Sequence, residues 1–125
     1  MGNRIVRPNI STAVVRHLTA TMGIEVRPST KRQEIPRQIT ITRVGGPSIS
    51  VVHEQAMVTI QAWSTVSNKD AEDLALEARS WIEQIDEPEC WFGHEIGGVV
   101  DYPDGVVGTH RYQFTVSLMA RGVQQ

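Results

Sequence analysis

Hydrophobic residues recur every four positions near the start of the chain, which is the pattern of an amphipathic helix. The residues of this stripe are Ile10, Val14, Leu18 and Met22. Asn9 is suited to cap the first turn, and Gly23 is suited to end the last one. The sequence therefore predicts a helix over 10–22.

Apolar and polar residues alternate in four later segments, as they do in half-buried strands. The predicted strands are 37–44, 56–64, 90–100 and 111–121. The alternation is clearest in the last of them, where five residues are expected to face inward: Tyr112, Phe114, Val116, Leu118 and Ala120. Three glycines interrupt 90–100 and predict a bulge or bend. A short extended piece is expected at 24–27, and an exposed basic loop near 27–37.

A second helix is predicted over 68–86. Asn68 is suited to cap it, acidic residues fill its first turn, and Asp86-Glu87-Pro88 ends it. The resulting order, α-β-β-α-β-β, predicts an α+β fold in which two helices pack on one face of a mostly antiparallel four-stranded sheet. We expect residues 1–125 to form one domain with flexible ends.

The two halves of the chain carry opposite charge, although the net charge is only −2. Residues 1–62 hold eight basic and three acidic residues, a balance of +5, whereas residues 63–125 hold four and eleven, a balance of −7. Opposed halves favour docking from copy to copy, or binding of an anionic partner through one half. A well-solvated surface is the alternative reading of the same pattern.

The residue types that carry enzymatic chemistry form no recognisable motif. Gly45-Gly46 and Gly97-Gly98 match neither a P-loop nor a dinucleotide-binding spacing. His53 and His94 each precede a glutamate, but neither extends to the H-E-x-x-H pattern of a zinc site. Cys90 has no activating partner in the sequence and is expected to be a buried structural residue. We therefore expect no enzymatic activity, metal or cofactor, and no apolar run approaches the roughly 18 residues of a membrane span.

Two features remain as candidate contact surfaces. The connection 45–55 is long for a hairpin and carries aliphatic residues, which predicts a projecting arm on a neighbouring molecule. With a stray apolar residue on the polar side of the second helix, the candidate contacts are Ile49, Val51, Val52 and Leu76. The basic loop supplies Arg27, Lys31, Arg32 and Arg37. Without interleaved aromatic residues, weak non-specific contact with DNA is the most that this loop supports.

Five pieces of the chain, taken in order, form the pattern of a known family. They are Gln38-Ile39-Thr40-Ile41-Thr42-Arg43-Val44-Gly45-Gly46, Val58-Thr59-Ile60-Gln61-Ala62-Trp63-Ser64, the helix 71–79, Tyr102-Pro103-Asp104 and Arg111-Tyr112-Gln113-Phe114-Thr115-Val116. In this order the chain resembles the small tail terminator proteins of long-tailed (siphovirus-type) double-stranded DNA phages, particularly phages of actinobacteria. The resemblance extends over most of the chain, and no single piece of it is diagnostic.

The resemblance implies an α+β protein that assembles into a hexameric ring. In that family the ring caps the tail tube, stops its polymerisation and presents the surface that joins tail to head. The expected partners are further copies in a homohexamer, the tube of major tail protein, and the head-completion or stopper protein, with DNA passing through the lumen. The expected location is the head–tail joint of the virion, after assembly in the host cytoplasm. The family has no catalytic residues.

Two other interpretations stay open. Another head–tail connector ring, a stopper or an adaptor, shares the size, the α+β character and the ring formation. A small ligand-binding or regulatory α+β domain would instead be a monomer or dimer with a concave apolar pocket. A connector ring is distinguished from a terminator by testing which isolated partner the protein binds, a tail tube or a portal-side ring.

The projecting arm leads to a direct test. Replacing Ile49 and Val51 together with serine is expected to weaken assembly and tail capping, because it removes the apolar side chains that a neighbouring molecule would cover. Assembly is measured as the mass of the complex in solution, and capping by binding to tail tubes. Unchanged assembly and capping would show that the arm makes no such contact.

Overall fold

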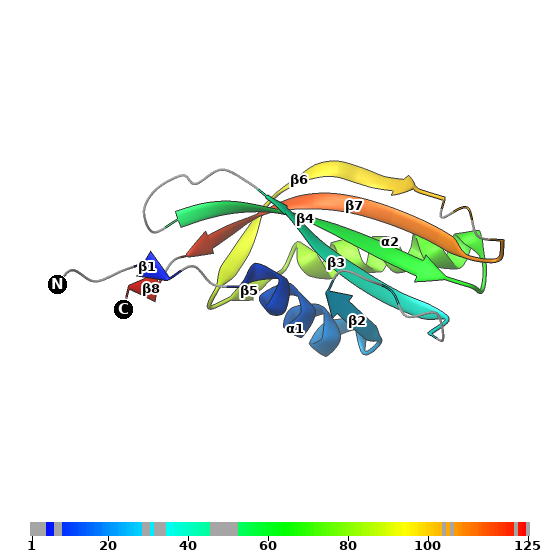
Figure 1. Ribbon diagram of the computed structural model, residues 1–125, viewed down its shortest axis with the longest axis horizontal. Coiled ribbons are helices and arrows are strands. Elements are labelled where there is room, and N and C mark those ends of the chain that lie inside the picture. Colours follow the sequence, from blue (N-terminus) through cyan, green and yellow to red (C-terminus); the bar gives the residue numbers. More distant parts are fainter. Residues whose placement is uncertain are drawn as a thin grey trace.

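Two helices and eight strands make up the part of the chain that the computed structural model describes, which is residues 5–6, 9–28, 31, 35–45, 53–103, 105, 107–121 and 123–124 (Figure 1). The helices are α1 (Ile10–Met22) and α2 (Asn68–Ile82). The strands are β1 (Ile5–Val6), β2 (Glu25–Pro28), β3 (Arg37–Gly45), β4 (His53–Ser64), β5 (Asp86–Glu87), β6 (Cys90–Asp101), β7 (His110–Arg121) and β8 (Val123–Gln124). Neither helix has the length and apolar character needed to cross a membrane.

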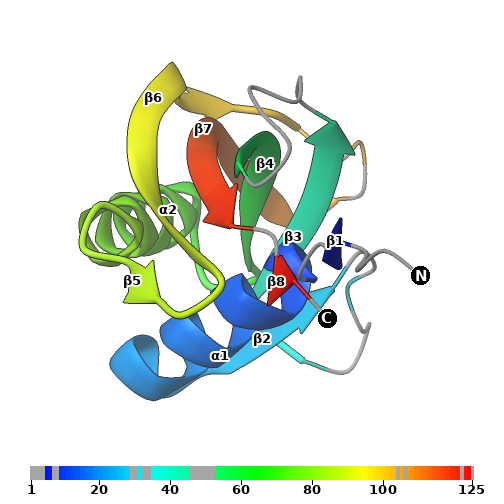
Figure 2. The ribbon, with the colours of Figure 1, turned by 90° about the vertical axis from the view of Figure 1, so that its left-hand side faces the viewer.

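Six of the strands form one mixed sheet in the order β2-β3-β4-β7-β6-β5. β2 runs parallel to β3, and the other neighbouring pairs are antiparallel. The sheet curls around the two helices, which lie inside its curve (Figure 2). β1 and β8 pair with each other in a separate two-stranded sheet, so the two ends of the described chain lie side by side.

The expected α+β class is confirmed, but the sheet has six strands rather than four. The four predicted strands correspond to β3, β4, β6 and β7, and a short strand is added beyond each outer one. At β2 the sequence predicts only an extended piece, because a single buried residue, Val26, gives no alternation to read. β5 has two residues, Asp86 and Glu87, which the sequence assigns to the end of the second helix.

α2 ends at Ile82, earlier than the sequence predicts. The N–H of Gln84 donates to the carbonyl of Trp81 at 3.0 Å, and that of Ile85 to the carbonyl of Ile82 at 3.1 Å, so the chain tightens to three-residue turns. Ile85 is still buried, which explains why it extends the apparent helical stripe. The cap of α2 is the Oγ of Ser67 rather than the predicted Asn68, and it accepts from the N–H of Asp70 at 3.0 Å.

The caps of α1 are confirmed. The Oδ1 of Asn9 accepts a hydrogen bond from the N–H of Thr12 at 3.1 Å, which satisfies a donor that the first turn leaves unpaired. Gly23 ends the helix with φ of 68°, in the left-handed region that a residue without Cβ enters at little cost. These two local signals fix where α1 begins and ends.

Both helices pack on one face of the sheet and share one core with it. The inward residues expected on β7 are all buried: Tyr112, Phe114, Val116, Leu118 and Ala120. Alternate residues of β4 from Ala56 to Ala62 complete the same face. The helices cover it with two apolar stripes, Ile10, Ala13, Val14 and Leu18 on α1, and Ala71, Leu74, Ala75, Ala78 and Ile82 on α2. Cys90 is buried in the same core, as expected.

The bulged strand β6 passes close to β7 at Gly93. A Cβ added to Gly93 would lie 2.7 Å from the carbonyl oxygen of Ser117, whereas a Cβ added to Gly97 would have no atom within 4 Å. The register of β6 on β7 shifts at three places, so the bulges that the glycines predict are present. Of the three glycines of β6, only Gly93 is required by close packing within the chain.

This difference predicts opposite effects of one substitution at the two glycines. Gly93→Ala is expected to lower the free energy of unfolding by about 1–3 kcal/mol, because the backbone of β6 must move away from β7. The matched variant, Gly97→Ala, is expected to stay within about 1 kcal/mol of wild type on the stabilising side, because it only restricts the unfolded chain. Urea unfolding followed by circular dichroism measures both. Equal stability of the two variants would contradict the close approach at Gly93.

Candidate assembly surfaces

Of the two predicted apolar contacts, the structure describes the one on the second helix but not the arm. Ile49, Val51 and Val52 lie outside the described residues, so their role stays a prediction. Leu76 lies on the outward side of α2 and is 37% exposed. It is therefore available to a partner, as a single apolar residue on an otherwise polar helix surface.

Three of the four basic residues expected to form one exposed loop are described, and each of these three has a different partner. Arg32 lies outside the described residues. Arg27 on β2 forms an ion pair with Glu25, with Nη1 and Oε2 3.4 Å apart. The Nζ of Lys31 lies 5.1 Å from the centroid of the Trp63 ring. Arg37, the first residue of β3, pairs with Asp70 on α2.

Asp70 joins the start of α2 to the end of β4 and the beginning of β3. Its Oδ2 accepts a hydrogen bond from the Oγ of Ser64 at 2.6 Å and another from the Nε of Arg37 at 2.8 Å. The hydrogen bond from Ser64 is the main reason that the pKa of Asp70 lies below its ordinary value, and the bond and charge of Arg37 lower it further. Arg37 thus has a structural use inside the chain, in addition to its charge at the surface.

Two cations lie over the indole of Trp63, at the end of β4 that also holds Ser64. The guanidinium carbon of Arg111 lies 4.7 Å from the ring centroid of Trp63 and 4.3 Å from that of Tyr102. With Lys31 also over Trp63, the four side chains form a cation–π arrangement that links the segment before β3 to the turn after β6. Arg111 also donates from Nε to the carbonyl of Tyr102 at 2.7 Å. This arrangement fixes the β6–β7 connection against β4.

The outward face of the central strands is polar and cross-linked by side chains. The hydroxyls of Thr59 and Thr115 are 3.0 Å apart, and the Nε2 of Gln61 donates to the Oε1 of Gln113 at 3.0 Å. The Oγ1 of Thr40 donates to the Oε1 of Gln61 at 3.3 Å, which extends this set of bonds to β3. Three adjacent strands are therefore tied together on the side away from the helices.

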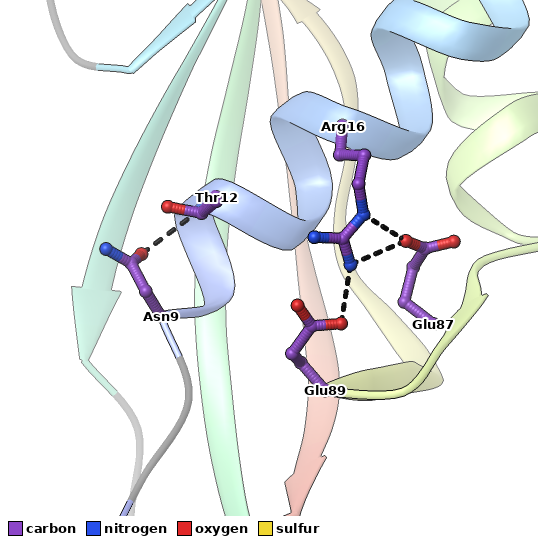
Figure 3. Close-up of polar contacts among 5 residues, drawn as sticks. All are labelled: Asn9, Thr12, Arg16, Glu87 and Glu89. Atoms are coloured by element: carbon purple, nitrogen blue, oxygen red, sulfur yellow. Dashed lines mark hydrogen bonds and ion pairs between the residues drawn. The ribbon is translucent and has the colours of Figure 1, made fainter.

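A charged cluster that the sequence analysis missed holds α1 against the β5–β6 turn (Figure 3). The guanidinium of Arg16 donates from Nε to the Oε1 of Glu87 at 2.7 Å and from Nη2 to the Oε1 of Glu89 at 2.5 Å. The hydrogen bond from Arg16 is the main cause that lowers the pKa of Glu89. Nothing in the sequence signals the cluster, because more than seventy positions separate Arg16 from both acids.

Burial of Cys90 beside these acids changes the chemistry of its thiol. Burial is the main cause that raises the pKa of Cys90 to about 12, and the negative charges of Glu89 and Glu87 add to it. The thiolate, which is the reactive form, is thus hardly populated at neutral pH. Among the described residues, no group of three or more His, Cys, Asp or Glu side chains could hold a metal ion.

The two ends of the strand order carry opposite charge. Between residues 24 and 45, which include β2 and β3, the described residues hold four basic side chains and one acidic side chain. Between residues 86 and 101, which include β5 and β6, there are five acidic and no basic side chains. The charge asymmetry of the sequence thus becomes a difference between one edge of the sheet and the other.

Comparison of the chain with models of known protein families and with curated proteins found no match. The charge at the sheet edges and the exposed residues along them therefore carry the functional argument, together with the resemblance described above.

The Asp70 junction predicts a pH-dependent contribution to stability. Asp70→Asn is expected to lower the free energy of unfolding at pH 7 by about 1–2 kcal/mol, because it removes the charge from a partly buried hydrogen-bonded pair. Since the pKa is lower in the folded state than its ordinary 3.8, this contribution is present above 3.8 and is lost as the pH falls through the folded value.

Urea unfolding of wild type and variant between pH 7 and pH 2 measures this contribution. Asp73→Asn is the matched control, because Asp73 is exposed and pairs only within α2, with Lys69. The role assigned to the junction would be contradicted if the two substitutions lowered the free energy of unfolding equally. It would also be contradicted if Asp70→Asn lowered it by the same amount at pH 7 and pH 2.

Proposed function

We propose that this protein is a ring-forming structural protein of a long-tailed phage, which caps the tail tube, stops its polymerisation and provides the surface that joins tail to head. The observation that carries the proposal is the opposite charge of the two edges of one curled sheet. A contact between two different surfaces of the same chain repeats from copy to copy, and it closes into a ring when the rotation allows. Opposed edges supply two such surfaces.

The resemblance to tail terminators supports the same proposal from the sequence side. Four of its five pieces fall on β3, β4, α2 and β7, which contribute to the shared core, and the fifth begins at Tyr102, just after β6. The four long strands β3, β4, β7 and β6 are antiparallel neighbours, as the family's sheet implies. In this role the protein has no catalytic site, and its partners are its own copies, the major tail protein and the head-completion protein.

The other head–tail ring proteins remain the second candidate, because opposed edges would suit a stopper or adaptor ring equally. The two roles differ in the partner that is bound first. A terminator binds the end of an isolated tail tube, whereas a stopper or adaptor binds a portal-side ring.

The mass of the purified protein in solution is the first test. Light scattering at low and at physiological salt is expected to give about six times the monomer mass, with weaker association at the higher salt because mobile ions screen the opposed charges. A monomer at both salt concentrations moves the test to recruitment by added tail tubes, measured by co-sedimentation. A monomer that tail tubes also fail to bind would contradict the proposed function.

A further inference from the structure

One long edge of the sheet is open. β5 pairs only with the first two residues of β6, Cys90 and Trp91, and the N–H of Phe92 donates to the carbonyl of Ile85 at 3.3 Å. From Gly93 to Asp101 no strand in the described part of the chain pairs with β6 on this side. An edge of this length presents unpaired backbone groups, which are suited to contact another chain.

The residues along this edge protect it only in part. Natural edges are blocked by lysine and other charges, by proline, by inward-pointing charges, by bulges, or by a covering helix or loop. Residues 93–101 contain no lysine and no proline, and Ile96 and Val100 are 45% and 49% exposed. The edge has three bulges and one inward-facing charge, Glu95, which pairs with Arg79 of α2, but among the described residues no strand covers it.

Neither close packing nor backbone conformation within the chain requires glycine at two positions of this edge. A Cβ at Gly97 would have no atom within 4 Å, and a Cβ at Gly98 would meet only the side chain of Glu95, at 3.8 Å. Neither glycine has the positive φ that favours this residue. Missing side chains at these positions allow another backbone to approach β6 closely.

The opposite edge is complementary in charge. β2 pairs with β3 only as far as Ile41, so β3 extends past it from Thr42 to Gly45. Arg27 and Arg43 lie on this edge, whereas residues 86–101 around the β6 edge hold five acidic and no basic side chains. Three of these acids also have ion-pair partners inside the chain: Glu87 and Glu89 pair with Arg16, and Glu95 pairs with Arg79. A contact of β6 with β6 of another copy would bring like charges together, but a contact of β6 with the β2–β3 edge joins opposite charges.

We propose that the open edge of β6, from Gly93 to Asp101, docks on the basic β2–β3 edge of a second copy of this chain. The inference rests on the proposed function only in requiring that copies assemble, and it names the two surfaces that meet. Backbone contact at Gly97 and Gly98, apolar contact at Ile96 and Val100, and the opposed charges act together. A pair of copies then keeps one unused edge of each kind, one on each copy, so the contact propagates.

Two variants that each inactivate one edge test this arrangement. Ile96→Lys with Gly98→Val blocks the β6 edge and leaves the interior untouched, because both positions are open on the outside. Arg27→Glu with Arg43→Glu reverses the basic edge, and Arg43→Glu alone is the second choice if the double variant unfolds. Val66→Lys is the matched control, since Val66 is 66% exposed in the turn before α2 and lies on neither edge.

Analytical ultracentrifugation near the highest soluble concentration measures association, and thermal unfolding checks that each variant is folded. Each edge variant alone is expected to associate at least tenfold more weakly than wild type, whereas Val66→Lys associates like wild type. An equal mixture of the two edge variants is expected to form dimers and nothing larger, because the mixture retains one intact edge of each kind.

Three results with the variants would overturn the inference. They are edge variants that associate like wild type, a mixture that stays monomeric, and a basic-edge variant that dimerises alone through β6. Wild type that stays monomeric at every concentration would also overturn the contact. The proposed function is decided separately by binding to tail tubes, so normal capping by an edge variant would refute the interface and leave the function standing.

Discussion

The pairing of β4 with β7 is the interaction on which the rest of the structure depends. The two strands pair without interruption, from His53 opposite Arg121 to Ser64 opposite His110. Every other strand of the main sheet is added outside this pair. One face of the pair holds the core residues against which both helices pack, and the other is cross-linked by threonine and glutamine side chains. No buried side-chain nitrogen or oxygen in the described part of the chain lacks a hydrogen-bond partner. Because β4 and β7 each have a paired strand on both sides, the open backbone edges of this sheet lie on its outer strands.

Local signals and long-range contacts differ sharply in how far the sequence predicts them. Asn9, Gly23 and the alternation along β7 depend on residues close in sequence, and each led to the correct element. β2 and β5 were missed as sheet strands, because two to four residues carry no period and pair only where the fold brings them. The cluster of Arg16 with Glu87 and Glu89, and the stack around Trp63, join distant segments, so no spacing rule reveals them. Of the predicted contact residues, Leu76 is exposed as expected, whereas Arg37 and Lys31 also have partners inside the chain.

The opposite charge of the two sheet edges connects the fold to the proposed function. In the sequence it is visible only as a difference between halves, which a solvated surface would explain equally well. The fold places the opposite charges at opposite edges of the sheet, because β2 and β3 come from the basic half of the chain, and β5 and β6 come from the acidic half. The open edge of β6 also holds glycines that packing within the chain does not require, and their missing side chains allow the backbone of another molecule to approach. Fold, charge and edge therefore all favour a protein that acts as one repeated unit of an assembly.

The length of tail tubes is the most direct measure of the central claim, that this protein ends the growth of a tube. Tubes of the cognate major tail protein are assembled with and without the protein, and their lengths are measured by electron microscopy. The account predicts shorter tubes when the protein is present during growth, with additional density at one end. Tubes of unchanged length and with unmodified ends would contradict it.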